Sequence, residues 1–188
     1  MLIYVHGFNS SSRSHKARLV HERMAALGCG AEYRCPDLDH RPSRAIEQLE
    51  ALIAGAGQPV ALIGSSLGGF YAAYLAERHA VRAALVNPAV KPYELLAGYL
   101  GRQRNLYTGA EYELTPQHLH ELCALEPRAI TPERYLLLVT TGDEVLDYRM
   151  ATARYAGCRQ VVVEGGDHGF SGFAEYLELV LDFCRTGR

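Results

Sequence analysis

Residues 60–69, VALIGSSLGG, join a continuous apolar run to a helical pattern that begins at Leu67. Such a run predicts a strand covered on both faces, as in a parallel sheet. The segment Gly64-Ser65-Ser66-Leu67-Gly68 fits Gly-x-Ser-x-Gly, a strand-to-helix turn that raises its central serine above the sheet edge. Gly64 and Gly68 are expected to let this turn close against its neighbours. Ser66 is therefore the predicted nucleophile. Ser65 is its rival within the motif, and a turn that serves packing alone is the alternative interpretation.

The sequence on either side of this turn alternates short strand-like runs with longer helical stretches. Strands are expected at residues 2–5, 32–35, 60–64, 83–86, 135–140 and 160–163, and helices at 14–27, 43–54, 67–78, 148–156 and 172–184. This alternation predicts an α/β protein whose parallel sheet carries helices on both faces. Right-handed crossovers and short connections favour a doubly wound, mostly parallel six-stranded sheet in the order 2-1-3-4-5-6. The 188 residues are expected to form one domain, 1–188.

Residues 87–131 break the alternation, because this stretch is much longer than an ordinary connection and contains four prolines. A long insertion in a compact domain is usually functional, so we expect a small helical cap or lid at about residues 88–131. A surface excursion without function is the alternative. Four tyrosines of the insertion either line an apolar tunnel or pack the cap onto the body: Tyr93, Tyr99, Tyr107 and Tyr112.

A serine hydroxyl is a poor nucleophile until a base accepts its proton. His168 is the candidate base, since it lies in the glycine-rich loop GGDHGF, residues 165–170, after the last expected strand. There an imidazole ring can reach over the sheet edge. The other histidines are less suited by position, on expected helices or at element ends: His15, His21, His40, His79, His118 and His120.

The base in turn needs a carboxylate that fixes its tautomer and stabilises its charged form. Asp143 follows the strand at 135–140, on the side of the sheet where ligands bind in such folds. Glu144 and Asp147 compete for the role, although Asp147 precedes a helix and is suited to capping it. Asp167 is the neighbour of His168 in the chain, and adjacent side chains seldom face each other. The order Ser66, Asp143, His168 is the serine, acid, histidine order of α/β-hydrolases.

The first strand runs into a His6-Gly7 turn, and in a doubly wound order it lies beside the strand that precedes Ser66. The Phe8 N–H is thereby expected next to Ser66, together with the Leu67 N–H at the start of a helix. Two such donors form an oxyanion hole. His6 is expected to brace this turn by hydrogen bonding. The serine-rich run at residues 10–14 either lines the pocket mouth, binds an anion, or forms a solvated loop.

Composition excludes several other classes of protein. A total of 19 Lys and Arg against 21 Asp and Glu gives a formal net charge of -2, so nucleic acid is not an expected partner. No apolar run approaches the ~20 residues of a membrane span, and residues 1–5 carry neither a charged leader nor a cleavage site. Five scattered cysteines favour a reduced, cytoplasmic protein over a disulfide framework or zinc site. No metal or organic cofactor is expected.

Four segments together resemble the small bacterial YqiA/YcfP-type esterases of the α/β-hydrolase superfamily: HGFNSS at 6–11, GSSLGGFY at 64–71, TGDEVLDY at 141–148 and GDHGF at 166–170. The resemblance runs from near Met1 to about Cys184. It implies a compact hydrolase that lacks the usual first two strands and acts on carboxylic esters, with acyl-CoA-like thioesters as further substrates. The matching motifs imply the same triad and the same two oxyanion donors. Many α/β-hydrolases carry Pro where Asp147 stands.

The expected activity is that of a serine esterase, which cleaves a small-molecule ester or thioester through an acyl-enzyme. Two alternatives remain open. One is a non-catalytic ligand-binding protein on a hydrolase scaffold, because a fold does not fix a function. The other is a dedicated acyl-CoA thioesterase, or a peptidase, that uses the same residues.

Overall fold

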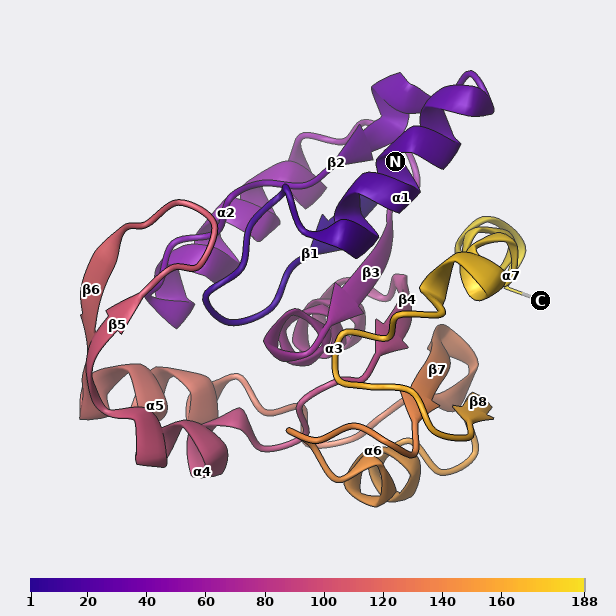
Figure 1. Cartoon of the computed structure of the whole chain (residues 1–188). Coiled ribbons are helices and arrows are strands. Elements are labelled where there is room, and N and C mark those ends of the chain that lie inside the picture. The colour runs from indigo at the N-terminus through magenta and orange to yellow at the C-terminus, as the bar shows by residue number, and fades with distance from the viewer. Residues whose placement is uncertain (188) are drawn as a thin grey trace.

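A computed structural model describes residues 1–187, and its centre is a six-stranded parallel sheet. The strands are β1 (Leu2–Val5), β2 (Tyr33–Arg34), β3 (Ala61–Ser65), β4 (Arg82–Val86), β7 (Tyr135–Thr140) and β8 (Arg159–Val163). They lie in the order β2-β1-β3-β4-β7-β8, and every neighbouring pair is parallel (Figure 1). Counted along this sheet alone, the order is 2-1-3-4-5-6, which confirms the predicted topology.

Helices cover both faces of the sheet. They are α1 (His15–Ala26), α2 (Pro42–Ala54), α3 (Leu67–His79), α6 (Tyr148–Arg154) and α7 (Phe173–Thr186), with a short 3₁₀ turn η1 (Gly30–Glu32) before β2. Successive side chains of a strand point to opposite faces, so each strand contributes to two cores. Ile3 and Val5 pack with α2 and α3, whereas Leu2 and Tyr4 pack with α1 and α7. Burial on both faces explains why these strands are continuous apolar runs.

The insertion after β4 is mixed in structure. It contains helices α4 (Pro92–Leu96) and α5 (Pro116–Ala124), the 3₁₀ turn η2 (Ala97–Tyr99), and an antiparallel hairpin, β5 (Gly101–Arg104) with β6 (Glu111–Leu114). A further 3₁₀ turn, η3 (Pro132–Arg134), joins it to β7. The sequence predicted a helical cap here; the structure contains the helices and adds a hairpin that the sequence did not predict. In Figure 1 the hairpin lies beside the loop that follows β1. There Asn105 Nδ2 donates to the Ser10 carbonyl at 2.8 Å, and the Leu106 N–H donates to the Asn9 carbonyl at 3.1 Å.

The far end of the insertion is fastened to α3. The N–H and hydroxyl of Thr131 donate to the Glu77 carboxylate at 2.7 and 2.8 Å, and Arg134 pairs with the same carboxylate at 2.6 Å. Residues 87–131 therefore leave the sheet at β4 and are tied down again just before β7. None of the helices within residues 1–187 combines the length and apolar character that crossing a membrane requires.

Candidate active site

Ser66 lies at the point where β3 turns into α3, with φ 55° and ψ −123°. Its backbone is held from both sides: its N–H donates to the Val86 carbonyl at 3.1 Å, and its carbonyl accepts from the Ala89 N–H at 3.0 Å. A positive φ at a non-glycine residue is a strained conformation that persists only where the surroundings impose it. The turn thereby lifts the Ser66 side chain out of the strand and leaves it partly exposed, whereas Ser65 is buried.

Small residues let the neighbouring segments close on this turn. A Cβ atom at Gly68 would overlap the carbonyls of Val5 and His6, and one at Gly64 would overlap the start of α3. A Cβ at Gly7 would lie 3.1 Å from Ser66 Cβ and 3.6 Å from its Oγ. The loop after β1 thus runs directly beside the serine.

His168 faces Ser66 from the loop after β8. Its Nε2 lies 3.1 Å from Ser66 Oγ, and its Nδ1 lies 2.9 and 3.0 Å from the two carboxylate oxygens of Asp143. The three residues are separated by up to 102 positions in the chain, yet they form one continuous row of hydrogen-bonding groups. Because an ionised carboxylate only accepts, Nδ1 carries the proton in this arrangement, and Nε2 is left to accept from the serine hydroxyl.

The carboxylate of Asp143 is buried and accepts hydrogen bonds from three residues. Its side chain is 2% exposed, and Oδ1 also accepts from the N–H groups of Val145 and Leu146 at 2.9 and 2.8 Å. Burial acts to raise the pKa of Asp143, but the hydrogen bonds from His168, Leu146 and Val145 outweigh it. The pKa of Asp143 therefore lies below its ordinary value. The carboxylate is ionised at neutral pH and faces the imidazole.

The rival acids occupy other positions. Glu144 accepts the backbone N–H of His168 at 2.9 Å, so it holds the histidine loop rather than the ring. Asp147 caps α6 by accepting from the Arg149 N–H at 3.0 Å. Asp167 bonds the N–H and hydroxyl of Ser171. The imidazole of His168 contacts Asp143 alone among these carboxylates.

Two residues that the sequence did not single out hold the histidine loop. Asn87 is buried at the end of β4, and its Nδ2 donates to the carbonyls of Asp167 and His168 at 3.1 and 3.2 Å. Lys16, on α1, donates to the Gly169 carbonyl at 2.5 Å. Asn87 has φ 41°, a conformation that asparagine tolerates better than most residues. Neither Asn87 nor Lys16 lies in a local sequence pattern that indicates these contacts.

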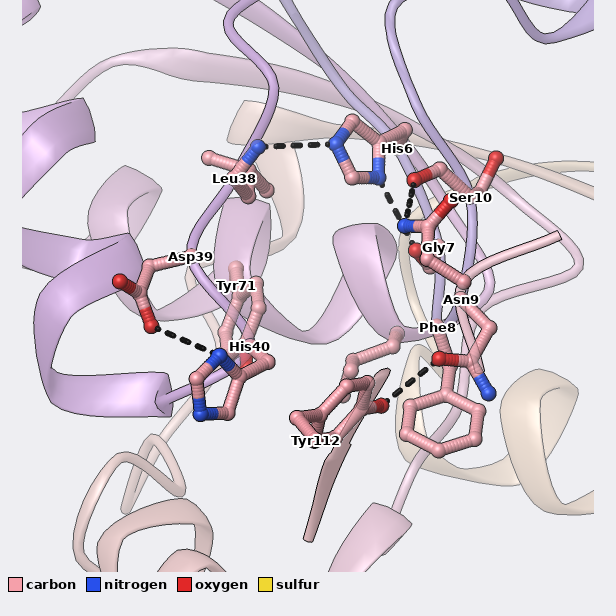
Figure 2. A pocket seen from close by; sticks show the side chains of 12 residues that line it. His6, Gly7, Phe8, Asn9, Ser10, Leu38, Asp39, His40, Tyr71 and Tyr112 are labelled. Atoms are coloured by element: carbon pink, nitrogen blue, oxygen red, sulfur yellow. Dashed lines mark hydrogen bonds and ion pairs between the residues drawn. The ribbon is translucent and has the colours of Figure 1, made fainter. Parts of the chain in front are cut away.

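Phe8 and Leu67 line one shared cavity of about 50 Å³. Leu67 is the first residue of α3, so its N–H has no acceptor within the helix. Because the sequence predicts oxyanion donors at Phe8 and Leu67, we call this cavity the oxyanion pocket. Its other walls come from residues 6–7, 9–10 and 38–40, and from Tyr71, Asn105 and Tyr112. In Figure 2 the Phe8 ring lies next to Tyr112, whose hydroxyl points to the Asn9 amide oxygen at 2.7 Å.

His6 makes two hydrogen-bonding contacts at the turn after β1. Its Nδ1 lies 3.0 Å from the Gly7 carbonyl, and its Nε2 accepts from the Leu38 N–H at 3.0 Å (Figure 2). Burial lowers the pKa of His6. The neutral ring, with its proton on Nδ1, satisfies both contacts and links the loop after β1 to the loop that follows β2.

The other serines, tyrosines and histidines considered from the sequence lie partly in the oxyanion pocket and partly elsewhere. Ser10 lines the oxyanion pocket and Ser11 is fully buried, so the serine run is more than a solvated loop. Tyr112 lines the same pocket, but Tyr99 and Tyr107 are about half exposed and Tyr93 bonds Glu126, which argues against an apolar tunnel of tyrosines. His118 is buried and completes the cap of α5 with Thr115. His40 is exposed at the pocket rim and packs against Tyr112.

The chain belongs to the family described as "Uncharacterised protein family (UPF0227)", whose model matches residues 1–185. Among curated relatives, the UPF0227 protein YcfP of Salmonella paratyphi A is 24% identical over 193 residues, with 100% of both chains covered. A UPF0227 protein of Pectobacterium atrosepticum is 23% identical over 194 residues, again with 100% of both covered. The suspected YcfP-type relationship is thereby confirmed.

Solved structures confirm the fold. Est1E from Butyrivibrio proteoclasticus superimposes with a TM-score of 0.70 at 20% identity, over 99% of this chain and 87% of that one. Alpha/beta hydrolase domain-containing protein 10 from mouse gives a TM-score of 0.70 at 17% identity, over 96% and 89%. At these identities the likeness establishes an α/β-hydrolase fold and leaves the chemistry to the residues of this chain.

Proposed function

We propose that this member of the UPF0227 family is a serine hydrolase that cleaves carboxylic esters through an acyl-enzyme intermediate. Ser66 is the nucleophile, His168 the general base and acid, and Asp143 the carboxylate behind it. The observation that carries the proposal is the continuous row from Ser66 Oγ through the two nitrogens of His168 to Asp143, with separations of 3.1 and 2.9 Å. Each separation lies within the reach that proton transfer requires.

In the acylation step, Ser66 Oγ attacks the ester carbonyl carbon while His168 Nε2 takes the hydroxyl proton. The carbonyl oxygen becomes an oxyanion, and the N–H groups of Phe8 and Leu67 stabilise it. His168 then gives the proton to the leaving alcohol, and the acyl group remains on Ser66. Asp143 stays ionised and stabilises the imidazolium throughout.

Deacylation repeats these steps with water. His168 Nε2 takes a proton from a water molecule, whose oxygen attacks the acyl carbon. The oxyanion forms again at the same two N–H groups. When it collapses, the Ser66 oxygen leaves as the hydroxyl, with the proton returned by His168, and the carboxylic acid departs. Loss of one oxyanion donor typically lowers turnover by about 10²–10³, so the turn after β1 is expected to contribute to the rate alongside the triad.

The same residues would cleave a thioester or an amide by the same steps. Initial rates on matched oxygen esters, thioesters and amides therefore rank these three substrate classes. A protein that only binds a ligand would cleave none of them.

The experiment is hydrolysis of p-nitrophenyl acetate by the purified protein and by two variants. Ser66→Ala should abolish turnover and leave the circular dichroism spectrum unchanged. Ser65→Ala is the matched control, since it removes the neighbouring hydroxyl of the same motif and should retain turnover. Parent-rate hydrolysis by Ser66→Ala would refute the assignment.

A further inference from the structure

A second cavity, of about 230 Å³, lies between the segment that leaves β4 and the loop that follows Asp143. We call it the apolar groove. Its walls come from residues 88–92, 94–95, 145–147 and 150, and eight of these eleven lining residues are apolar. Leu95, Val145 and Met150 are 38%, 44% and 46% exposed, so its apolar surface is accessible to a ligand from solvent.

The walls of the groove are bonded directly to the triad. Ala89 donates its N–H to the Ser66 carbonyl at 3.0 Å, and Leu146 donates its N–H to Asp143 Oδ1 at 2.8 Å. Both residues line the groove. The groove therefore adjoins the triad: one wall is bonded to the backbone of Ser66 and the other to the side chain of Asp143.

The two cavities differ in size and in polarity. The oxyanion pocket, at about 50 Å³, has room for about three to five water-sized groups. Asn9, Asp39, His40, Asn105 and Tyr112 bring polar atoms to its walls. The apolar groove offers about 230 Å³ and mostly hydrocarbon surface. A short arm fits the first cavity, and a longer apolar arm fits the second.

The chemistry of the ester decides which arm goes where. Under the proposed function the carbonyl oxygen lies at the N–H groups of Phe8 and Leu67, two residues that line the oxyanion pocket. We therefore assign the acyl substituent to that small cavity. The leaving oxygen must face His168 Nε2 to receive its proton. His168 is held by Asp143, and the chain that continues from Asp143 forms a wall of the groove.

Each charged residue that lines the groove has a partner of opposite charge. Lys91 pairs with Glu94 at 3.1 Å, and Asp147 accepts from the Arg149 N–H and pairs with the Arg149 guanidinium at 3.6 Å. A leaving group that carries phosphates, such as coenzyme A, would meet no unpaired cation among these residues. An uncharged apolar alcohol needs no cation there, and its hydrocarbon is removed from water when it lies in the groove.

Resting on the proposed function, we infer that the preferred substrates are short-chain acyl esters, acetyl to propionyl, of apolar alcohols, with the alcohol in the apolar groove. The acyl chain is limited by the oxyanion pocket, and the alcohol is selected by Leu95, Val145 and Met150.

The test uses two isomers of equal hydrophobicity, hexyl acetate and ethyl hexanoate, which differ only in the side of the ester that carries the chain. We expect kcat/KM for hexyl acetate to exceed that for ethyl hexanoate by at least about tenfold, because only the alcohol side offers apolar surface to four extra methylenes. Acetyl-coenzyme A should be cleaved more slowly than hexyl acetate.

Two substitutions locate the preference. Leu95→Gln and Met150→Gln should each lower the ratio of kcat/KM for hexyl acetate over ethyl acetate by about fivefold, since each makes the groove wall polar. Both side chains are partly exposed, so the fold tolerates the change. Leu27→Gln is the matched control, because Leu27 is 50% exposed at the end of α1 and should leave the ratio at its parent value.

The outcomes separate a failure of the inferred substrate preference from a failure of the proposed esterase function. Ethyl hexanoate cleaved as fast as hexyl acetate, or faster, overturns the inference while the esterase stands. Hydrolysis of p-nitrophenyl acetate without cleavage of either isomer also overturns the inference. So does a ratio of kcat/KM for hexyl acetate over ethyl acetate that is unchanged in both Leu95→Gln and Met150→Gln. Failure to cleave any of these esters in a Ser66-dependent way overturns the proposed function itself.

Discussion

Ser66 carries the most strained backbone of the proposed triad, with φ 55° and ψ −123°. A conformation of this kind costs about 1–3 kcal/mol at a residue with a side chain. It is kept because Gly64 and Gly68 allow β1, β3 and α3 to close on the turn, and because Val86 and Ala89 bond the Ser66 backbone. The strain holds the hydroxyl in front of His168.

Replacing Ser66 with glycine tests this strain. Glycine adopts positive φ freely, but it also gives the unfolded chain up to about 1 kcal/mol more conformational entropy. We expect the free energy of unfolding of Ser66→Gly in urea to match or exceed the parent value, by up to about 2 kcal/mol. A loss of more than about 1 kcal/mol would show that the turn is not strained.

Asp143 and Asp147 lie four residues apart and are expected to respond very differently to removal of charge. Asp143→Asn should lower kcat by about 10³–10⁴, since the amide no longer fixes the imidazole tautomer or stabilises its charged form. Asp147→Asn should leave kcat nearly unchanged, because that side chain caps α6. Steady-state rates on p-nitrophenyl acetate decide between them, and the opposite result moves the acid to Asp147.

The residues proposed for the triad could be predicted because each one follows its own strand at the same sheet edge. Asn87 and Lys16 could not be predicted in their roles. Lys16 reaches Gly169 across 153 positions in the chain, and Asn87 reaches His168 across 81. No local pattern reports contacts of that range, so the side chains that hold a catalytic loop are found only in the folded chain.

Among the secondary-structure elements, α1 is joined to the histidine loop through a buried cation. Lys16 is 9% exposed, and burial lowers its pKa to about 8, against the opposing pull of Asp167 and Asp143. Its ordinary value is about 10.4. Between these two values the unfolded chain binds more protons than the folded chain, so the free energy of unfolding should rise with pH.

Lys16→Met measures this contribution, because methionine keeps the aliphatic volume without the charge. From pH 7 to pH 9.5 the free energy of unfolding of the parent should rise relative to the variant by about 1–2 kcal/mol. Urea denaturation at the two pH values gives the difference. A flat or falling difference would mean that the amine titrates at its ordinary pKa.

The hairpin β5–β6 shows why elements of the insertion were harder to predict than those of the sheet. Its strands read GRQR and EYEL, which contain no β-branched residue and no continuous apolar face. The hairpin forms because Asn105 and Leu106 bond the loop after β1. Its conformation depends on tertiary contacts that override weak local propensity.

Helix α5 is fastened to the start of α2 through Glu121. Its carboxylate accepts from the Ser43 N–H at 3.0 Å and from Arg41 at 3.1 Å, and its side chain is 13% exposed. Burial acts to raise the pKa of Glu121, but these hydrogen bonds outweigh it and lower the pKa to about 2. The stability that Glu121 contributes is present above its ordinary pKa, about 4.3, and is lost as pH falls toward 2.

Glu121→Gln should therefore remove an acid-sensitive part of the stability. At pH 7 the variant should lose about 1–3 kcal/mol of unfolding free energy, the usual contribution of hydrogen bonds to a charged group. The gap between parent and variant should close as the pH is lowered from about 4 toward 2. Thermal unfolding across this range provides the measurement, and a gap that stays constant would contradict the assigned pKa.

At the scale of the whole molecule, the sheet order followed from the sequence alone, as did the sheet edge at which Ser66, Asp143 and His168 meet. The alternation of apolar runs and helical stretches restricts the topology to very few choices, and in a parallel sheet all strand ends of one kind share an edge. The two cavities could not be predicted from the sequence. Their volumes depend on how residues 88–131 pack over that edge, which is a property of the folded insertion.

The central claim is that folding brings Ser66 and His168 together so that the serine becomes a nucleophile. A fluorophosphonate that adds covalently to activated serines, followed by peptide mapping in a mass spectrometer, tests it most directly. The account predicts one adduct per chain, on Ser66, in the native protein, and none in His168→Ala or in urea-unfolded protein. An unmodified native chain, or an adduct on Ser65 or any other residue, would contradict it.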